Sequence, residues 1–179
     1  RVYTAAEMEM LVGLVRERLA HGPVCLVGYH GKLQEAAAIL HRGGLTAALL
    51  APDRVFEALE VCREHGMPLG AVWKSDSPEA LAARSGEYVR LRHTHRPGPV
   101  EEPSRILLSG WQFDAACRQT GEAAWQVALS DHSDFEQLLA YVQASGARLV
   151  IADGFRSTSA AVFAGEVRRR LGVRALALP

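Results

Sequence analysis

The sequence predicts an α/β protein with three layers, α/β/α, around a mostly parallel sheet. Segments whose apolar residues recur at helical spacing alternate along the chain with short apolar runs of strand length. The chain has 179 residues, of which 49% are hydrophobic, which is enough for roughly one domain with a full core. Strands separated by helices favour parallel pairing with helices on both faces of the sheet.

Each predicted helix lies between capping residues, glycines or prolines. Thr4 can cap the first helix with Glu7 three residues further on, and the apolar spacing continues until residues 21–23, His-Gly-Pro, end it. The same signals predict the later helices at residues 32–40, 53–65, 78–84, 135–144 and 158–171.

The predicted strands are short apolar runs between turn residues. They span residues 24–27, 46–50, 68–73, 87–92, 105–108, 125–129, 147–152 and 174–178. Residues 96–103 contain three prolines and one glycine, a composition typical of a linker or a long loop.

Charge and cysteine content limit the function classes. Lys and Arg number 20, and so do Asp and Glu, so bulk positive charge does not hold this protein on nucleic acid. A net charge of zero remains compatible with a protein that binds a few phosphates in a cleft. Cys25, Cys62 and Cys117 are widely spaced, which predicts reduced thiols in a cytoplasmic protein. Every apolar run is far shorter than the ~18 residues of a membrane span, so we expect no membrane partner.

The junction between the strand at 125–129 and the next helix carries the sharpest chemical motif. Ser130, His132 and Ser133 lie where the N–H groups of a helix N-terminus favour phosphate. His132 is a candidate phosphate ligand or proton donor to a leaving oxygen. The alternative is an ordinary capped helix with a surface histidine.

A second strand-to-helix junction follows at residues 153–159. Asp153 ends a predicted strand, a position typical of catalytic or metal-binding carboxylates, and Arg156 is placed to meet an anion. The alternative is that Asp153 only hydrogen-bonds the turn, while Ser157 or Thr158 caps the helix.

The turn from Gly28 to Gly31, followed by Lys32, is similar to a phosphate-cradling turn. Its glycines permit close approach of the backbone, but the Gly-Lys-Ser/Thr spacing of a Walker A motif is absent. An ordinary structural turn is the alternative interpretation.

Two further segments have weaker signals. Ser109-Gly110-Trp111 offers a hydroxyl and an aromatic ring that could stack on a base, although a buried tryptophan is an equal alternative. His93 and His95 would share one strand face in a metal-like arrangement, but no third ligand follows them in the sequence.

Together these loops resemble the β-CASP branch of the metallo-β-lactamase nucleases. Residues 32–37, Lys-Leu-Gln-Glu-Ala-Ala, resemble that family's helix after a glycine-containing loop. The most specific part is Ser-Gly-Trp at 109–111 followed by Leu-Ser-Asp-His-Ser-Asp-Phe at 129–135. This pair is similar to the Ser-Gly-Trp and Ser-x-His-x-Asp elements of the bacterial ligase-associated DNA exonucleases.

The resemblance implies a fold, two regions and a set of roles. Residues 1–104 would be a β-CASP-like region, and residues 105–179 would be the C-terminal end of the metallo-β-lactamase fold. His132 would lie at the scissile phosphate as an acid catalyst. Asp153 stands where most members have a zinc-binding histidine, so it would be a catalytic or metal-binding residue. Contacts to the substrate would come from Gly28, Gly31, Ser109, Gly110, Ser130, Ser133 and Arg156.

The family's zinc-binding signature, His-x-His-x-Asp-His, is absent from this sequence. The resemblance therefore implies either that the metal-binding half lies outside these residues or that the protein is a degenerate relative. Expected partners are DNA or RNA, most naturally single-stranded ends, and zinc is expected for the complete family member. Two alternatives stay open: a non-catalytic module that binds nucleic acid or protein, and an α/β enzyme that binds a nucleotide or sugar phosphate.

Overall fold

The computed structural model describes residues 5–95, 100–110, 115–130, 132–155 and 159–178. The chain divides into two compact units, Tyr3–Asp131 and His132–Pro179, which we call the N-terminal and C-terminal units. Arg156 and the proposed cap Thr4 lie outside the described residues. Within the described parts of the chain, no helix combines the length and apolar character needed to cross a membrane.

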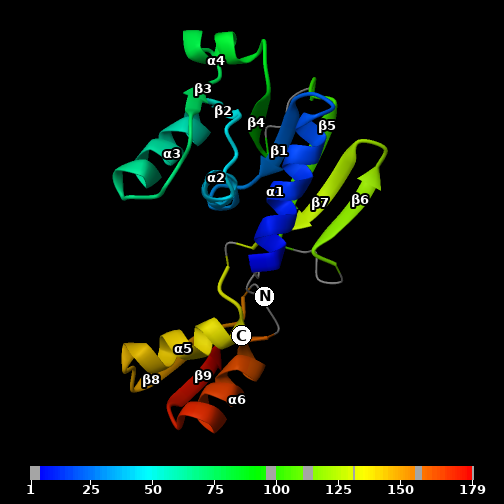
Figure 1. The fold of residues 1–179 in the computed structure, drawn as a ribbon. Coiled ribbons are helices and arrows are strands. Elements are labelled where there is room, and N and C mark those ends of the chain that lie inside the picture. Colours follow the sequence, from blue (N-terminus) through cyan, green and yellow to red (C-terminus); the bar gives the residue numbers. More distant parts are fainter. Residues whose placement is uncertain (1–4, 96–99, 111–114, 131, 156–158, 179) are drawn as a thin grey trace. The chain divides into compact units, whose positions relative to one another are not determined.

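The N-terminal unit is built on a seven-stranded sheet with the order β3-β2-β4-β1-β5-β7-β6 (Figure 1). Six of these strands run parallel, and only β6 pairs antiparallel, with β7. The strands are β1 (Val24–Gly28), β2 (Ala48–Ala51), β3 (Val72–Lys74), β4 (Tyr88–His93), β5 (Ser104–Ser109), β6 (Cys117–Gly121) and β7 (Ala124–Ala128). The predicted α/β class and mostly parallel sheet are confirmed.

Three helices, α1 (Ala5–Leu19), α2 (Lys32–Arg42) and α3 (Asp53–Glu64), pack side by side against this sheet. Their apolar faces join Val24 and Leu26 of β1 in the main core. The short helix α4 (Pro78–Ala83) contacts β2 and β3, and Ser77 caps it by accepting the N–H of Ala80. Because side chains alternate along a strand, Cys25 and Val27 point to the opposite face of the sheet from Val24 and Leu26.

The C-terminal unit has its own two-stranded parallel sheet and its own small core. Strands β8 (Leu149–Asp153) and β9 (Arg174–Leu178) pair in parallel, and helices α5 (Phe135–Ser145) and α6 (Ala160–Leu171) bury Leu139, Val142, Ala164, Val167 and Ala175. On the other face of these strands, Leu149, Ile151, Leu176 and Leu178 are each 44–58% exposed.

The structure differs from the sequence-based expectations in two respects. Strand β6 was not predicted, because its sequence Cys-Arg-Gln-Thr-Gly has little apolar content and four of its five residues are exposed. The division into compact units falls between residues 131 and 132, and residues 105–128 of the expected second region belong to the N-terminal unit. Strand β5 pairs with β1, which places it in the first sheet together with its neighbour β7.

Candidate functional site

The predicted site residues fall into two groups, one in each unit. Gly28, Gly31, Ser109, Gly110 and Ser130 belong to the N-terminal unit. The C-terminal unit contains His132, Ser133 and Asp153. Each group is described below within its own unit.

In the N-terminal unit, the carboxyl ends of parallel strands bring Lys32, Gly110 and Ser130 together. Gly110 follows β5, Ser130 follows β7 by two residues, and Lys32 begins the helix after β1. A Cβ atom built on Gly110 would lie 3.5 Å from Ser130 Oγ and 3.8 Å from Lys32 Cε. Glycine at this position therefore leaves room between the hydroxyl and the lysine side chain. We call Lys32, Gly110 and Ser130 the Lys32 group.

Lys32 is unusual because it is a lysine with only 6% of its surface exposed. Its Nζ lies 5.9 Å from the centroid of the Tyr29 ring. Removing an ammonium group from water is costly unless other groups interact with the charge. A buried lysine in the first turn of a helix, beside a serine hydroxyl and a glycine, is a suitable arrangement for binding an anion.

The turn before α2 uses its two glycines differently. Gly28 is buried, and a Cβ atom added to it would lie 3.4 Å from side-chain atoms of Leu108 and Leu33. Glycine at this position therefore permits close packing around the end of β1. Gly31 has a φ of +88°, which favours glycine, and its N–H donates to Gln34 Oε1 over 2.7 Å. The Gly31 N–H is therefore engaged in capping α2, whereas the backbone shape of the turn brings Lys32 to the strand ends.

Four aromatic rings beside this turn form a cluster that sequence reasoning did not assemble. The His30 ring centroid lies 4.6 Å from that of His93, and the His93 and His95 centroids are 5.5 Å apart. Tyr29 packs edge-on against His93 and His95 at 5.4 and 5.0 Å. Residues 29–30 and 93–95 are far apart in the sequence. They lie close together in the structure because β1 pairs in parallel with β4, which places Gly28 opposite His93. We call His30, His93 and His95 the histidine cluster.

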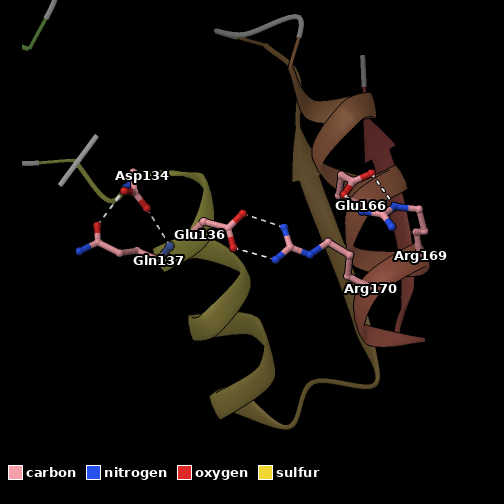
Figure 2. Close-up of polar contacts among 6 residues, drawn as sticks. All are labelled: Asp134, Glu136, Gln137, Glu166, Arg169 and Arg170. Atoms are coloured by element: carbon pink, nitrogen blue, oxygen red, sulfur yellow. Dashed lines mark hydrogen bonds and ion pairs between the residues drawn. The ribbon is translucent and has the colours of Figure 1, made fainter. Parts of the chain in front are cut away.

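In the C-terminal unit, Asp134 begins α5 with a capping box, shown in Figure 2. Its Oδ1 accepts the N–H of Gln137 at 2.9 Å, and Gln137 Oε1 accepts the Asp134 N–H at 3.0 Å. His132 and Ser133 are exposed immediately before this cap. The predicted capped helix is therefore confirmed, and the cap uses one of the N–H donors of the first turn.

Paired charges connect α5 to α6 behind this cap. Arg170 donates two hydrogen bonds of 2.7 Å to the Glu136 carboxylate, and Arg169 pairs in the same way with Glu166 on its own helix (Figure 2). The hydrogen bond from Arg170 lowers the pKa of Glu136. Two arginines of the run at 168–170 are thus engaged in ion pairs.

Asp153 ends β8 on the exposed face of the small sheet. Its Oδ1 accepts the N–H of Phe155 at 2.9 Å, which is the turn-stabilising bond that we considered as the alternative to a catalytic role. Across the described residues, no group of three or more His, Cys, Asp or Glu side chains is arranged to hold a metal ion. The Asp153 carboxylate thus takes part in the turn that follows β8.

A cavity of about 390 Å³ lies between α1 and α2, apart from the predicted site residues. Its walls include Met8, Val12 and Ile39, and Arg16 and Arg42 also line it. The Arg16 guanidinium donates to the carbonyl of Gly43, and Arg42 pairs with Glu35 at 3.1 Å. The Arg16 contact joins the last turn of α1 to the end of α2, whereas the Arg42–Glu35 ion pair lies within α2.

Comparison with known proteins adds one relative without an assigned activity. No protein-family model matches the chain. A curated protein of Acidianus ambivalens, described as an uncharacterized protein in lig 3'region, is 32% identical over 62 residues. These residues are 34% of this chain and 44% of that protein, so the match covers less than half of either one.

Proposed function

We propose that this chain is the substrate-clamping part of a metal-dependent phosphodiesterase that acts on DNA or RNA. The observation that carries the proposal is the Lys32 group, in which a buried lysine, a glycine and a serine converge at the carboxyl ends of parallel strands. Ligands of α/β proteins commonly bind at this edge of the sheet. The motif resemblance supports the same assignment, since Ser109, Gly110 and Ser130 belong to its most specific elements.

In this proposal, Lys32 and Ser130 contact a backbone phosphate, and Ser109, which precedes Gly110 in the chain, is a further contact to the substrate. His132 is the proton donor to the leaving oxygen, and Ser133 and Arg156 are further phosphate contacts. The proposal takes residues 1–104 as the β-CASP-like region and residues 105–179 as the C-terminal end of a metallo-β-lactamase fold. Zinc chemistry belongs to a His-x-His-x-Asp-His motif that this sequence does not contain.

The role of the Lys32 group is tested by replacing the chain's two lysines in turn. We expect Lys32→Met to weaken binding of a fluorescent oligothymidylate at least tenfold, because it removes a buried cation from the phosphate site. Lys74→Met is the matched control, since Lys74 is partly exposed and its Nζ lies 3.4 Å from an Asp53 carboxylate oxygen. Fluorescence anisotropy at several salt concentrations measures both variants.

The proposal also predicts the effect of adding a side chain at Gly110. Gly110→Ala should weaken binding and leave the melting temperature nearly unchanged, because the added Cβ makes only ordinary van der Waals contacts at 3.5–3.8 Å. Equal affinities for Lys32→Met and Lys74→Met would contradict the proposal. Binding of a mononucleotide without binding of the oligonucleotide would instead favour a nucleotide-dependent α/β enzyme.

The proton-donor role of His132 requires an activity measurement. In a preparation of the protein with measurable nuclease activity, His132→Ala should lower turnover by about 10²-fold or more, the usual effect of losing a general acid. His65→Ala, at the C-terminus of α3, is the control. An unchanged rate for His132→Ala would exclude the assigned role.

A further inference from the structure

The described part of the C-terminal unit has helices on only one face of its two-stranded sheet. Val150, Ala152 and Ala175 lie on that covered face and pack with residues of α5 and α6. Parallel strands in α/β proteins are usually covered on both faces. The opposite face, which we call the open face, is formed by Leu149, Ile151 and Asp153 of β8 and by Arg174, Leu176 and Leu178 of β9.

The open face is mostly apolar, with one charge at each end. Its side chains form three cross-strand pairs, from the amino to the carboxyl end: Leu149 with Arg174, Ile151 with Leu176, and Asp153 with Leu178. The four aliphatic side chains are each about half exposed. Arg174 and Asp153 are also exposed, and within the described residues neither forms an ion pair. Contiguous apolar surface of this kind is typical of an interaction site.

The positions of the two charges make the open face complementary to itself. When two such faces stack with their strands in opposite directions, Asp153 of one copy lies at the same end of the interface as Arg174 of the other. A twofold axis produces this contact twice. If the strands ran in the same direction, Asp153 would lie near Asp153 and Arg174 near Arg174, and like charges repel. Stacked sheets lie about 10 Å apart, which an arginine and an aspartate extending from facing sheets can bridge.

We propose that the open face binds the open face of a second copy of this chain, in a symmetric dimer whose stacked strands run in opposite directions. Ile151 and Leu176 form the centre of the interface, and Asp153 of each copy pairs with Arg174 of the other. Four half-exposed aliphatic side chains per copy give an interface at or below about 1,200 Å² in total, so the dimer is weak. The Lys32 group takes no part in this contact.

Sedimentation velocity at chain concentrations from about 5 to 500 μM tests the dimer, because small interfaces have dissociation constants in this range. We expect the average mass to rise from 19.4 kDa toward twice that value as the concentration increases. Ile151→Lys should stay monomeric, because it places a charge at the centre of an apolar interface. Val61→Lys is the matched control, since Val61 is 53% exposed on α3 and this variant should dimerise like the unsubstituted chain.

Charge reversal tests the direction of the strands. Asp153→Lys and Arg174→Asp should each raise the dissociation constant at least tenfold, because each brings like charges together at both ends of its own dimer. An equimolar mixture of the two variants should dimerise about as well as the unsubstituted chain, since every charge then meets its opposite. A mixture that associates no better than either variant alone would overturn the proposed pairing of Asp153 with Arg174.

The remaining outcomes separate a second copy from other occupants of the open face. A chain that keeps a mass of 19.4 kDa at every concentration would overturn the dimer. In that case a lower melting temperature of Ile151→Lys would assign the face to a contact within the chain, and an unchanged one would assign it to a different protein. A dimer that Ile151→Lys leaves intact would place the interface on another surface and would also overturn the proposal.

Discussion

At the scale of single residues, Cys25 shows how burial alters a titratable group. It is fully buried in β1, on the sheet face that also carries Arg90 and Arg105 beside it in the neighbouring strands. Burial raises the pKa of the Cys25 thiol to about 11, with a further contribution from Glu102, and three arginines oppose this shift. The thiol is therefore neutral and unreactive at physiological pH.

The raised pKa of Cys25 predicts a loss of stability in alkali. Between pH 9 and 11 the folded thiol keeps its proton, whereas the unfolded thiol loses it, so rising pH favours unfolding. We expect a loss of at most about 2–3 kcal/mol from this group, and urea unfolding at pH 8, 10 and 11 measures it. Cys25→Ala should show a shallower decline than Cys62→Ala, and identical declines would contradict the prediction.

At the scale of elements, the buried carboxylate of Glu102 attaches the connection between β4 and β5 to β4. The Glu102 side chain is fully buried; it accepts a hydrogen bond from Arg90 Nε, and its other oxygen lies 4.0 Å from Arg92 Nη2. Burial alone would lower the pKa of Arg90, but the hydrogen bonds and charge interactions with Glu102 and Tyr88 together outweigh this effect and raise it. One carboxylate thus neutralises charge on a strand that ends at the histidine cluster.

Removing that carboxylate should destabilise the N-terminal unit. We expect Glu102→Gln to lower the free energy of unfolding by about 3–5 kcal/mol, because it removes the carboxylate charge beside the buried Arg90 guanidinium. Chemical denaturation measures the loss. Glu101→Gln is the control, since Glu101 is exposed and should change stability by less than about 0.5 kcal/mol. A loss below about 1 kcal/mol for Glu102→Gln would mean that the arginines reach solvent in the variant.

At the scale of the whole molecule, two compact units have different degrees of apolar coverage. In the N-terminal unit, every residue of β1 is buried, as expected for a central parallel strand. In the C-terminal unit, α5 and α6 pack around a core that includes Ala175, while Ile151 and Leu176 on the other strand face are more than half exposed. The apolar runs at 147–152 and 174–178 predicted these two strands, but a run of this kind does not say which face is covered.

The sequence predicted the helices well because their signals are local. Helix α2 lies where residues 32–40 predicted it and extends to Arg42, and α5 begins at Phe135 directly after its cap, as expected. Strand β6 escaped prediction because an exposed edge strand needs no apolar pattern. For the candidate site, the motif at 129–135 indicated Ser130 and His132 as candidate residues. The sequence did not predict that the Lys32 side chain is buried; this became clear only from the structure.

The sequence by itself determined the α/β class, most of the helices and strands, and the glycine and serine residues at the ends of the strands. Those features follow from periodicity, capping and turn chemistry within a few residues of each position. Only the tertiary structure decided that β4 lies beside β1, that His30 therefore meets His93, and that Gly110 leaves room between Lys32 and Ser130. The physical reason is that strand order depends on pairing between distant segments, which no local pattern encodes.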